Sequence, residues 1–194
     1  AELPGDAGAM LMIEVDGPES AMAEMLKAVS DVALTEGLLS LKTARTAGEV
    51  AALWATRKAL SPALRNVAPK KINEDVVVPV SRIPELLTGL ENLAEKHAIN
   101  IVNFGHAGNG NIHVNLLVDP DDPRQLASAD ACLDEVFSLV LGLGGSLSGE
   151  HGIGLVKRDF ISQEIDPATL QIMRAIQRNF DPNNILNPNK SLPS

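Results

Sequence analysis

The chain contains no tyrosine, one tryptophan and four phenylalanines among its 194 residues. Single-stranded nucleic acids are bound largely by aromatic side chains on which bases stack, and this composition offers no such platform. The formal net charge of −9 also argues against a nucleic-acid surface, which shows clustered lysine and arginine. We therefore expect no nucleic-acid partner.

A single cysteine, Cys132, excludes an internal disulfide and fits a reducing compartment. No apolar run approaches the roughly 20 residues that a membrane helix needs, and residues 1–6 have no signal-peptide character. These absences favour a cytoplasmic location. Peripheral contact of the complete protein with the inner membrane stays open as an alternative.

Three common active-site motifs are also missing. The chain has no Gly-x-Gly-x-x-Gly, no Gly-x-x-x-x-Gly-Lys-Ser/Thr and no Gly-x-Ser-x-Gly. It therefore carries neither a cradle of its own for a dinucleotide pyrophosphate nor a nucleophile elbow.

Apolar periodicity and turn signals predict one domain in which strands and helices interleave. The predicted strands cover residues 10–15, 38–43, 73–79 and 146–148. The predicted helices cover residues 19–35, 47–64, 82–97, 122–141, 154–164 and 167–179. A hairpin in the middle of the chain makes part of the sheet antiparallel. This favours an α+β fold, with a largely antiparallel sheet and helices packed on one face, over a doubly wound parallel fold.

Residues 103–115 form that hairpin and predict a two-histidine site. Asn109-Gly110 is the strongest short-range signal for a hairpin with a two-residue type I′ turn. With these two residues as the loop, His106 pairs with His113 on one face, their Cβ atoms roughly 5 Å apart. The period-2 rule then places Asn111 and Asn115 on the histidine face, and Ile112, Val114, Leu116 and Val118 on the opposite, apolar face.

Imidazole pairs suit zinc, manganese or iron, but two ligands leave a metal site incomplete. Glu150 is the candidate third ligand, because the glycines around it let the backbone of its turn come close to a bound group. Together with His106 and His113 it would leave coordination positions open for substrate. The alternatives are a solvated Glu150 in a plain glycine-rich turn and histidines that are ordinary surface or core residues.

Arg57 lies on the apolar stripe of the helix predicted over residues 47–64. An inward guanidinium is costly unless an anion meets it, and Ser61, four residues on, could share that anion. A substrate carboxylate suits Arg57, because arginine binds it with two hydrogen bonds. An arginine over the core edge, or one paired with a structural carboxylate, is equally consistent. Lys71 is by itself typical of a solvated charge.

Several stretches of the sequence carry a family resemblance in order along the chain. They are Gly105-His-Ala-Gly-Asn-Gly-Asn-Ile-His113, Ser148-Gly-Glu-His-Gly-Ile-Gly154, Asp181-Pro-Asn-Asn-Ile-Leu-Asn-Pro-Asn-Lys190 and Lys71-Ile-Asn-Glu-Asp-Val-Val-Val-Pro79. They resemble the C-terminal domain of FAD-linked oxidases in the vanillyl-alcohol oxidase superfamily. The group includes D-lactate dehydrogenases, D-2-hydroxyglutarate dehydrogenases and the flavin subunit of glycolate oxidase. Asn109 departs from the usual Asp, which improves the turn and removes a charge near the site.

The resemblance implies a ferredoxin-like cap domain of a flavoenzyme that removes hydride from C2 of a 2-hydroxy acid and leaves a 2-oxo acid. It implies a divalent metal, commonly zinc, that polarises the hydroxyl as a Lewis acid. The metal ligands would be His106, His113 and Glu150, with His151 as the general base. The substrate would be bound by Arg57, Ser61, Lys71 and Asn115. The family closes over the flavin near Asn187 and Lys190, whose alternative is a loop that simply ends the chain.

The family binds the FAD pyrophosphate through a separate N-terminal domain, and nothing in residues 1–194 corresponds to it. We therefore expect this chain to be the substrate and metal half of an enzyme, inactive alone, as a truncated or natural piece of a larger protein. The expected partners are a small 2-hydroxy acid, the FAD-binding domain of the same protein and an electron acceptor, with a homodimer left open. The alternative is a stand-alone metal- or acid-binding module, or a metal-dependent hydrolase, without flavin.

Overall fold

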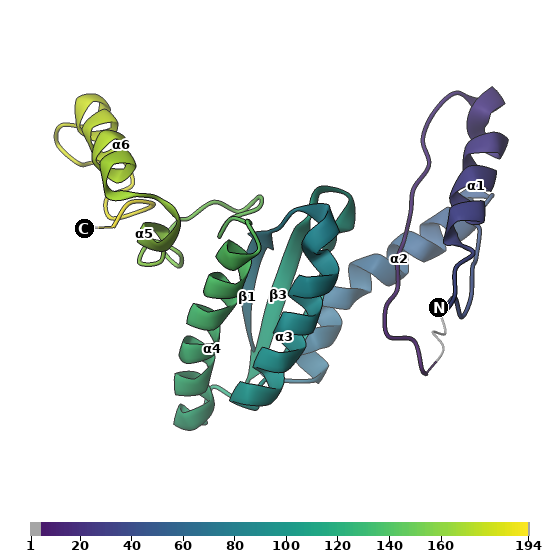
Figure 1. Cartoon of the computed structure of the whole chain (residues 1–194), viewed down its shortest axis with the longest axis horizontal. Helices are drawn as coiled ribbons and strands as arrows, with labels where there is room; N and C mark the ends of the chain where they lie inside the picture. Colours follow the sequence, from purple (N-terminus) through teal and green to yellow (C-terminus); the bar gives the residue numbers. More distant parts are fainter. Residues whose placement is uncertain (1–4, 194) are drawn as a thin grey trace. The chain divides into compact units, whose positions relative to one another are not determined.

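The structure, a computed structural model, describes residues 5–193 (Figure 1). Contacts within the chain divide it into two compact units, Ala1–Pro62 and Ala63–Ser194, and each is described by itself. The first unit holds helix α1 (Glu19–Ala33) and nearly all of helix α2 (Ala47–Ala63). The sheet and the remaining helices belong to the second. Whether both units act as the one domain expected from the sequence stays a prediction.

A three-stranded antiparallel sheet forms the centre of the second unit. Its strands are β1 (Lys70–Val77), β2 (Asn100–His106) and β3 (Asn111–Val118), in the order β1-β3-β2. Helix α3 (Ile83–His97) connects β1 to β2, and helix α4 (Pro123–Gly142) follows β3. Ser146 then forms an isolated antiparallel bridge with Val77 beside β1. This β-α-β-β-α order with a returning segment beside β1 is ferredoxin-like, and the predicted α+β class is confirmed.

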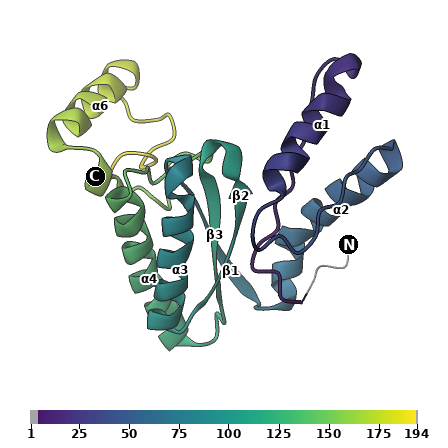
Figure 2. The same ribbon diagram turned by 45° about the vertical axis from the view of Figure 1, so that its right-hand side comes forward.

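Helices α3 and α4 pack against each other along one face of the sheet (Figure 2). The hydrophobic core lies between these helices and the apolar face of β3, whose four predicted inward residues are all buried. Capping fixes where α4 begins, because the Asp122 side chain accepts hydrogen bonds from the N–H groups of Arg124 and Gln125. Asp166 caps helix α6 (Pro167–Phe180) in the same way.

Short elements complete the fold. One α-helical turn, α5 (Ile161–Glu164), precedes α6. The 3₁₀ turns are η1 (Leu64–Asn66), η2 (Val80–Arg82) and η3 (Ala107–Asn109). No helix in residues 5–193 is long and apolar enough to cross a membrane. Cys132 is a free cysteine buried on α4.

Four predicted elements differ from the structure. Residues 10–15 and 38–43 form no strand. A strand is stable only where a neighbouring strand completes its hydrogen-bond ladder, and neither segment has such a neighbour within residues 5–193. The apolar side chains of both segments are largely exposed. The strand predicted at 146–148 reduces to the single Ser146 bridge. The helix predicted over 154–164 is a series of turns that ends in α5. Gly154 has a positive φ of 57°, so a right-handed helix cannot begin at that residue.

Candidate metal and substrate site

The hairpin between β2 and β3 has a longer loop than the sequence predicted. A 3₁₀ turn over Ala107–Asn109 is followed by Gly110 at φ 79°. Asn109 does not adopt a left-handed backbone; its side chain instead accepts a hydrogen bond from the N–H of Asn111. Gly110 fits closely against the chain after β1, where a Cβ atom would lie 1.9 Å from the carbonyl oxygen of Val78. The predicted two-residue type I′ turn is therefore wrong.

The longer loop shifts the strand register by two positions. His106 pairs with Asn111, and His113 pairs with Phe104, so the direct pairing of the two histidines is also wrong. Because side chains alternate with period 2, an even shift leaves each one on its predicted face. His106 and His113 are diagonal neighbours on the polar face, with ring centroids 5.5 Å apart.

The polar face of the sheet carries the site. Antiparallel pairing sets Asp75 of β1 opposite His113, Asn73 opposite Asn115 and Lys71 opposite Leu117. Directly opposite residues share a face, so these β1 side chains point to the same side as the histidines. His113 and Asp75 are buried, whereas His106 is 46% exposed. The site is therefore enclosed by protein around His113 and Asp75 and exposed to solvent around His106.

Glu150 comes to this face from the turn after the Ser146 bridge. Its Oε1 lies 3.5 Å from Nε2 of His113, 3.8 Å from Nε2 of His106 and 3.6 Å from Nε2 of His151. Gly149 makes the approach possible, because a Cβ atom there would lie 2.7 Å from the side chain of Asn111. One carboxylate oxygen thus converges with three imidazole nitrogens.

His151 lies over His113, with the two rings stacked at 5.5 Å and an interplanar angle of 15°. Its side chain is 53% exposed. One ligand atom from each of Asp75, His113, Glu150 and His151 can be chosen so that all four lie within 4.8 Å of one another. Imidazole nitrogens and carboxylate oxygens at such spacing fit a divalent transition metal.

Asp75 was not singled out from the sequence. Its Oδ2 accepts hydrogen bonds from the N–H groups of Gly149, Glu150 and His151 at 3.0, 2.7 and 3.1 Å. Burial works to raise the pKa of this carboxyl, but the N–H groups of Glu150 and His151, together with nearby positive charge such as that of Lys157, hold the pKa below its ordinary value. The period-2 spacing of Lys71, Asn73 and Asp75 along a predicted strand was the signal that could have revealed it.

A buried ion pair lies directly behind Asp75. Nζ of Lys157 lies 3.7 Å from Oε2 of Glu74 and donates a hydrogen bond to the backbone carbonyl of Asp75. Burial raises the pKa of Glu74 and lowers that of Lys157, and the attraction between the two charges opposes both shifts. Neither residue was predicted to be part of the site. Lys157 falls in the segment, residues 154–164, that was expected to be a helix.

The predicted substrate residues lie in different parts of the chain. Arg57, half-buried, and Ser61 lie on α2, and Lys71 begins the polar face of β1. Asn115 is fully buried; its Oδ1 accepts a hydrogen bond from Asn73 and its Nδ2 donates to the carbonyls of Val102 and His113. The role of each in binding substrate stays a prediction.

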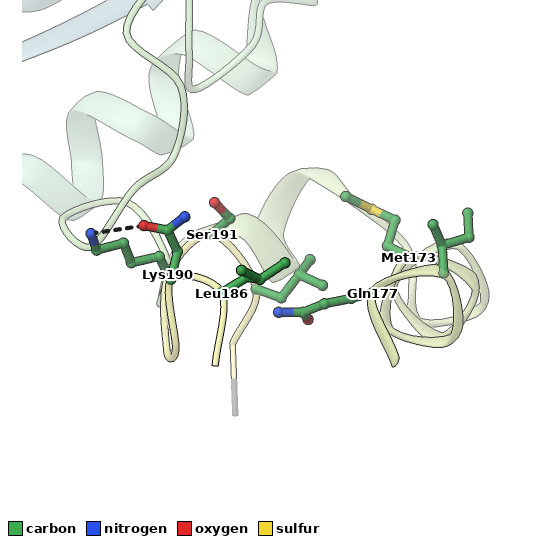
Figure 3. A pocket seen from close by; sticks show the side chains of 8 residues that line it. Met173, Gln177, Leu186, Lys190 and Ser191 are labelled. Atoms are coloured by element: carbon green, nitrogen blue, oxygen red, sulfur yellow. Dashed lines mark hydrogen bonds between the residues drawn. The ribbon is translucent and has the colours of Figure 1, made fainter. Parts of the chain in front are cut away.

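The two predicted flavin-proximal residues are bonded to each other near the end of the chain. Nζ of Lys190 donates to Oδ1 of Asn187 at 3.3 Å (Figure 3). Both line a hollow of about 420 Å³ against α6, together with Met173, Gln177 and Leu186. The lining of this hollow is largely apolar. Contact of Asn187 and Lys190 with a flavin stays a prediction.

Comparisons with known proteins find relatives that match most or all of this chain. The glycolate oxidase subunit GlcD of Escherichia coli strain K12 is 33% identical over 194 residues, all of this chain and 39% of that protein. The D-lactate dehydrogenase of Anaerostipes hadrus is 34% identical, covering 97% of this chain and 40% of that one. The D-2-hydroxyglutarate dehydrogenase of Stutzerimonas stutzeri strain A1501 is 32% identical, covering 89% and 37%.

A solved structure shares the fold. The 4-ethylphenol oxidase from Gulosibacter chungangensis, in an isoeugenol complex, superposes with a TM-score of 0.64 at 18% identity, over 92% of this chain and 38% of that one. The chain thus spans 37–40% of the length of these relatives. The model of "FAD linked oxidases, C-terminal domain" matches residues 1–191. The chain belongs to the family of FAD-linked oxidases, whose C-terminal domain it contains.

Proposed function

We propose that this chain is the substrate- and metal-binding part of an FAD-dependent dehydrogenase that oxidises a D-2-hydroxy acid to the 2-oxo acid. The observation that carries the proposal is the convergence of Oε1 of Glu150 with Nε2 of His106, His113 and His151 within 3.8 Å. Family membership supports the reaction class, since relatives are named for glycolate, D-lactate and D-2-hydroxyglutarate.

His106, His113 and Glu150 are the proposed metal ligands. Nε2 of His113 and Oε1 of Glu150 face each other from the sheet and the turn, and His106 completes the group from β2. A divalent ion such as zinc, when bound there, supplies a Lewis acid for the substrate hydroxyl. The exposed sides of His106 and Glu150 leave room for substrate, as catalytic metal sites require.

His151 is the proposed general base. Its exposed imidazole lies beside the proposed ligands, with Nε2 3.6 Å from Oε1 of Glu150, so it can accept the hydroxyl proton of a substrate bound at the open side. Its ring lies nearly parallel to that of His113, with the two centroids 5.5 Å apart. His151 is also the competing candidate for a metal ligand, because it belongs to the compact group of ligand atoms.

Arg57, Ser61, Lys71 and Asn115 are proposed to bind the substrate. A guanidinium holds a carboxylate with two parallel hydrogen bonds, which makes Arg57 the main anchor. Lys71 shares the polar face with His113 and adds positive charge there.

FAD, when bound by the complete enzyme, supplies the acceptor for the hydride that leaves C2 of the substrate. We propose that another domain of the same protein holds most of it, with Asn187 and Lys190 nearby. The remaining partner is an electron acceptor that reoxidises the flavin. We further propose a cytoplasmic enzyme, in peripheral contact with the inner membrane where its acceptor lies there.

The test is an assay of the complete protein, FAD-binding domain included, with glycolate, D-lactate and D-2-hydroxyglutarate and an artificial electron acceptor. We expect turnover of at least one acid, and a fall in kcat/KM of more than about 100-fold in Glu150→Ala. His97→Ala is the matched control, because His97 is paired with Glu135 at the end of α3. Full activity in Glu150→Ala would reject the proposed site.

The isolated chain gives a second result. It should purify colourless and oxidise none of the three acids. A yellow preparation with turnover would show that this chain holds FAD without another domain. Metal-dependent hydrolysis by the colourless chain would instead favour a flavin-free enzyme.

A further inference from the structure

Asp75 uses its two carboxylate oxygens for different tasks. Oδ2 accepts the N–H groups of the turn that carries Glu150, at distances of 2.7–3.1 Å. Oδ1 lies 3.3 Å from Nδ1 of His113, directly across from it in the sheet. The Asp75 side chain is 1% exposed, so both tasks are carried out away from water. One buried side chain therefore touches both the turn and the imidazole of the site.

The contact with His113 constrains the position of its proton. Oδ1 of Asp75 and Nδ1 of His113 are buried, and neither has any fully formed hydrogen bond within residues 5–193. They are within hydrogen-bond distance but short of the ideal alignment, as is common before a ligand tightens a site. The carboxylate can only accept, so the two atoms are complementary when Nδ1 of His113 carries the proton.

The tautomer decides what the other nitrogen can do. A neutral imidazole carries one proton, so a protonated Nδ1 leaves a lone pair on Nε2. Nε2 of His113 is the atom that faces Oε1 of Glu150 at 3.5 Å. Asp75 thus directs the lone pair toward the place where the proposed ligands converge.

Asp75 belongs to the compact group of possible ligand atoms, but it is poorly placed to bind an ion held by Nε2 of His113. Its Oδ1 faces Nδ1 of His113, whereas the proposed ion would bind Nε2 on the other side of the ring. Its Oδ2 already accepts hydrogen bonds from three N–H groups. Lys157 also donates a hydrogen bond to the backbone carbonyl of Asp75, which holds this part of β1 in place. Metal-bound histidines commonly donate their second ring N–H to such a carboxylate, which fixes the orientation of the ring.

We propose that Asp75 is the positioning residue of the metal site. It holds His113 as the Nδ1–H tautomer and anchors the backbone of Glu150, so that both ligands are set before an ion arrives. The inference rests on the proposed function only in naming His113 and Glu150 as metal ligands. The tautomer itself is a property of the metal-free chain.

The test uses ¹⁵N-labelled, metal-free chain at pH 8, with the tautomer of His113 read from its ring nitrogen shifts. We expect the Nδ1–H form in the parent. In Asp75→Asn, the amide oxygen keeps the three N–H groups of the turn and the NH₂ faces His113, so the ring should change to the Nε2–H form. Loss of the Nε2 lone pair should weaken zinc binding, measured by calorimetry, by about 10- to 100-fold.

Asp181→Asn is the matched control. Asp181 is a second buried aspartate, and it accepts the N–H groups of Ile185 and Leu186 in another turn. This variant weakens a turn anchor of the same kind, and should leave the His113 tautomer and zinc affinity unchanged.

The outcomes separate the two proposals. An Nε2–H form of His113 in the parent, or an unchanged tautomer in Asp75→Asn, overturns the positioning role of Asp75. The parent measurement decides even if Asp75→Asn does not fold. A parent chain that shows the Nδ1–H form but binds no zinc supports the positioning of His113 and rejects the metal site instead.

Discussion

Oε1 of Glu150 lies 3.5 Å from Nε2 of His113, although one residue comes from the middle of the sheet and the other from the turn that follows α4. The imidazole is 8% exposed and the carboxylate 48%. A cation held by both would be enclosed by protein on one side and open on the other. An open coordination position is what distinguishes catalytic metal sites from closed structural ones.

Arg57→Lys in the complete enzyme tests the proposed carboxylate anchor. Lysine keeps the charge but loses the planar fork that holds two oxygens at once. We expect kcat/KM for the 2-hydroxy acid to fall by about ten- to several-hundred-fold, on the order of 1.5–3 kcal/mol for a charged hydrogen bond, with little change in Tm. Arg65→Lys, on the exposed side of η1, is the control. A lowered Tm with normal kinetics would identify Arg57 as part of a structural ion pair.

Cys132 tests the packing of α4 against the sheet. Burial raises the pKa of its thiol to about 11, so almost none is thiolate at pH 8. We expect a thiol reagent such as dithionitrobenzoate to react at least about 100-fold more slowly with the native chain than with the chain unfolded in guanidinium. Ser138→Cys, exposed on the same helix, should add one thiol that reacts at once. Prompt reaction of native Cys132 would contradict the described core.

His113 gives a pH dependence. Burial lowers the pKa of its imidazole from the ordinary 6.5, against the attraction of Asp75 and Glu150. The unfolded chain therefore takes up this proton first as the pH falls. His113 leaves the free energy of unfolding unchanged above pH 6.5 and reduces it progressively from there down through the lower, folded-state pKa.

Two measurements check this sign. An NMR titration of the metal-free chain should give a pKa below 6.5 for His113. His113→Gln should lose less unfolding free energy than the parent between pH 6.5 and the folded-state pKa. A pKa of 6.5 or higher would show that the carboxylates, and not burial, dominate the environment of His113.

The sequence predicted the faces of the hairpin better than its register. Alternation alone assigned His113 to the polar face and Val114 to the core, and this survives any even shift of register. The turn was predicted wrongly because Asn109-Gly110 is compatible with two loops, a two-residue type I′ turn and the longer loop that the structure contains. The contact between Gly110 and Val78 favours the longer loop, and Val78 belongs to the segment after β1, which is distant in the sequence.

Asp75 shows why part of the site could not be predicted. Its role depends on pairing with His113 across the sheet and on the turn at residues 149–151, more than 70 positions later. Glu150 was accessible to sequence reasoning, because its flanking glycines indicate a turn with close approaches. The strands predicted at 10–15 and 38–43 failed for the related reason that a strand depends on its neighbour.

Zinc titration of the isolated chain by calorimetry tests the metal site most directly. We expect one ion per chain, and binding weaker by at least about 100-fold in the double variant His106→Ala/His113→Ala, because each imidazole supplies a ligand. His97→Ala should bind like the parent, and His151→Ala should retain more affinity than His106→Ala if His151 is the base. Binding by the double variant that is no weaker than binding by the parent would contradict the account.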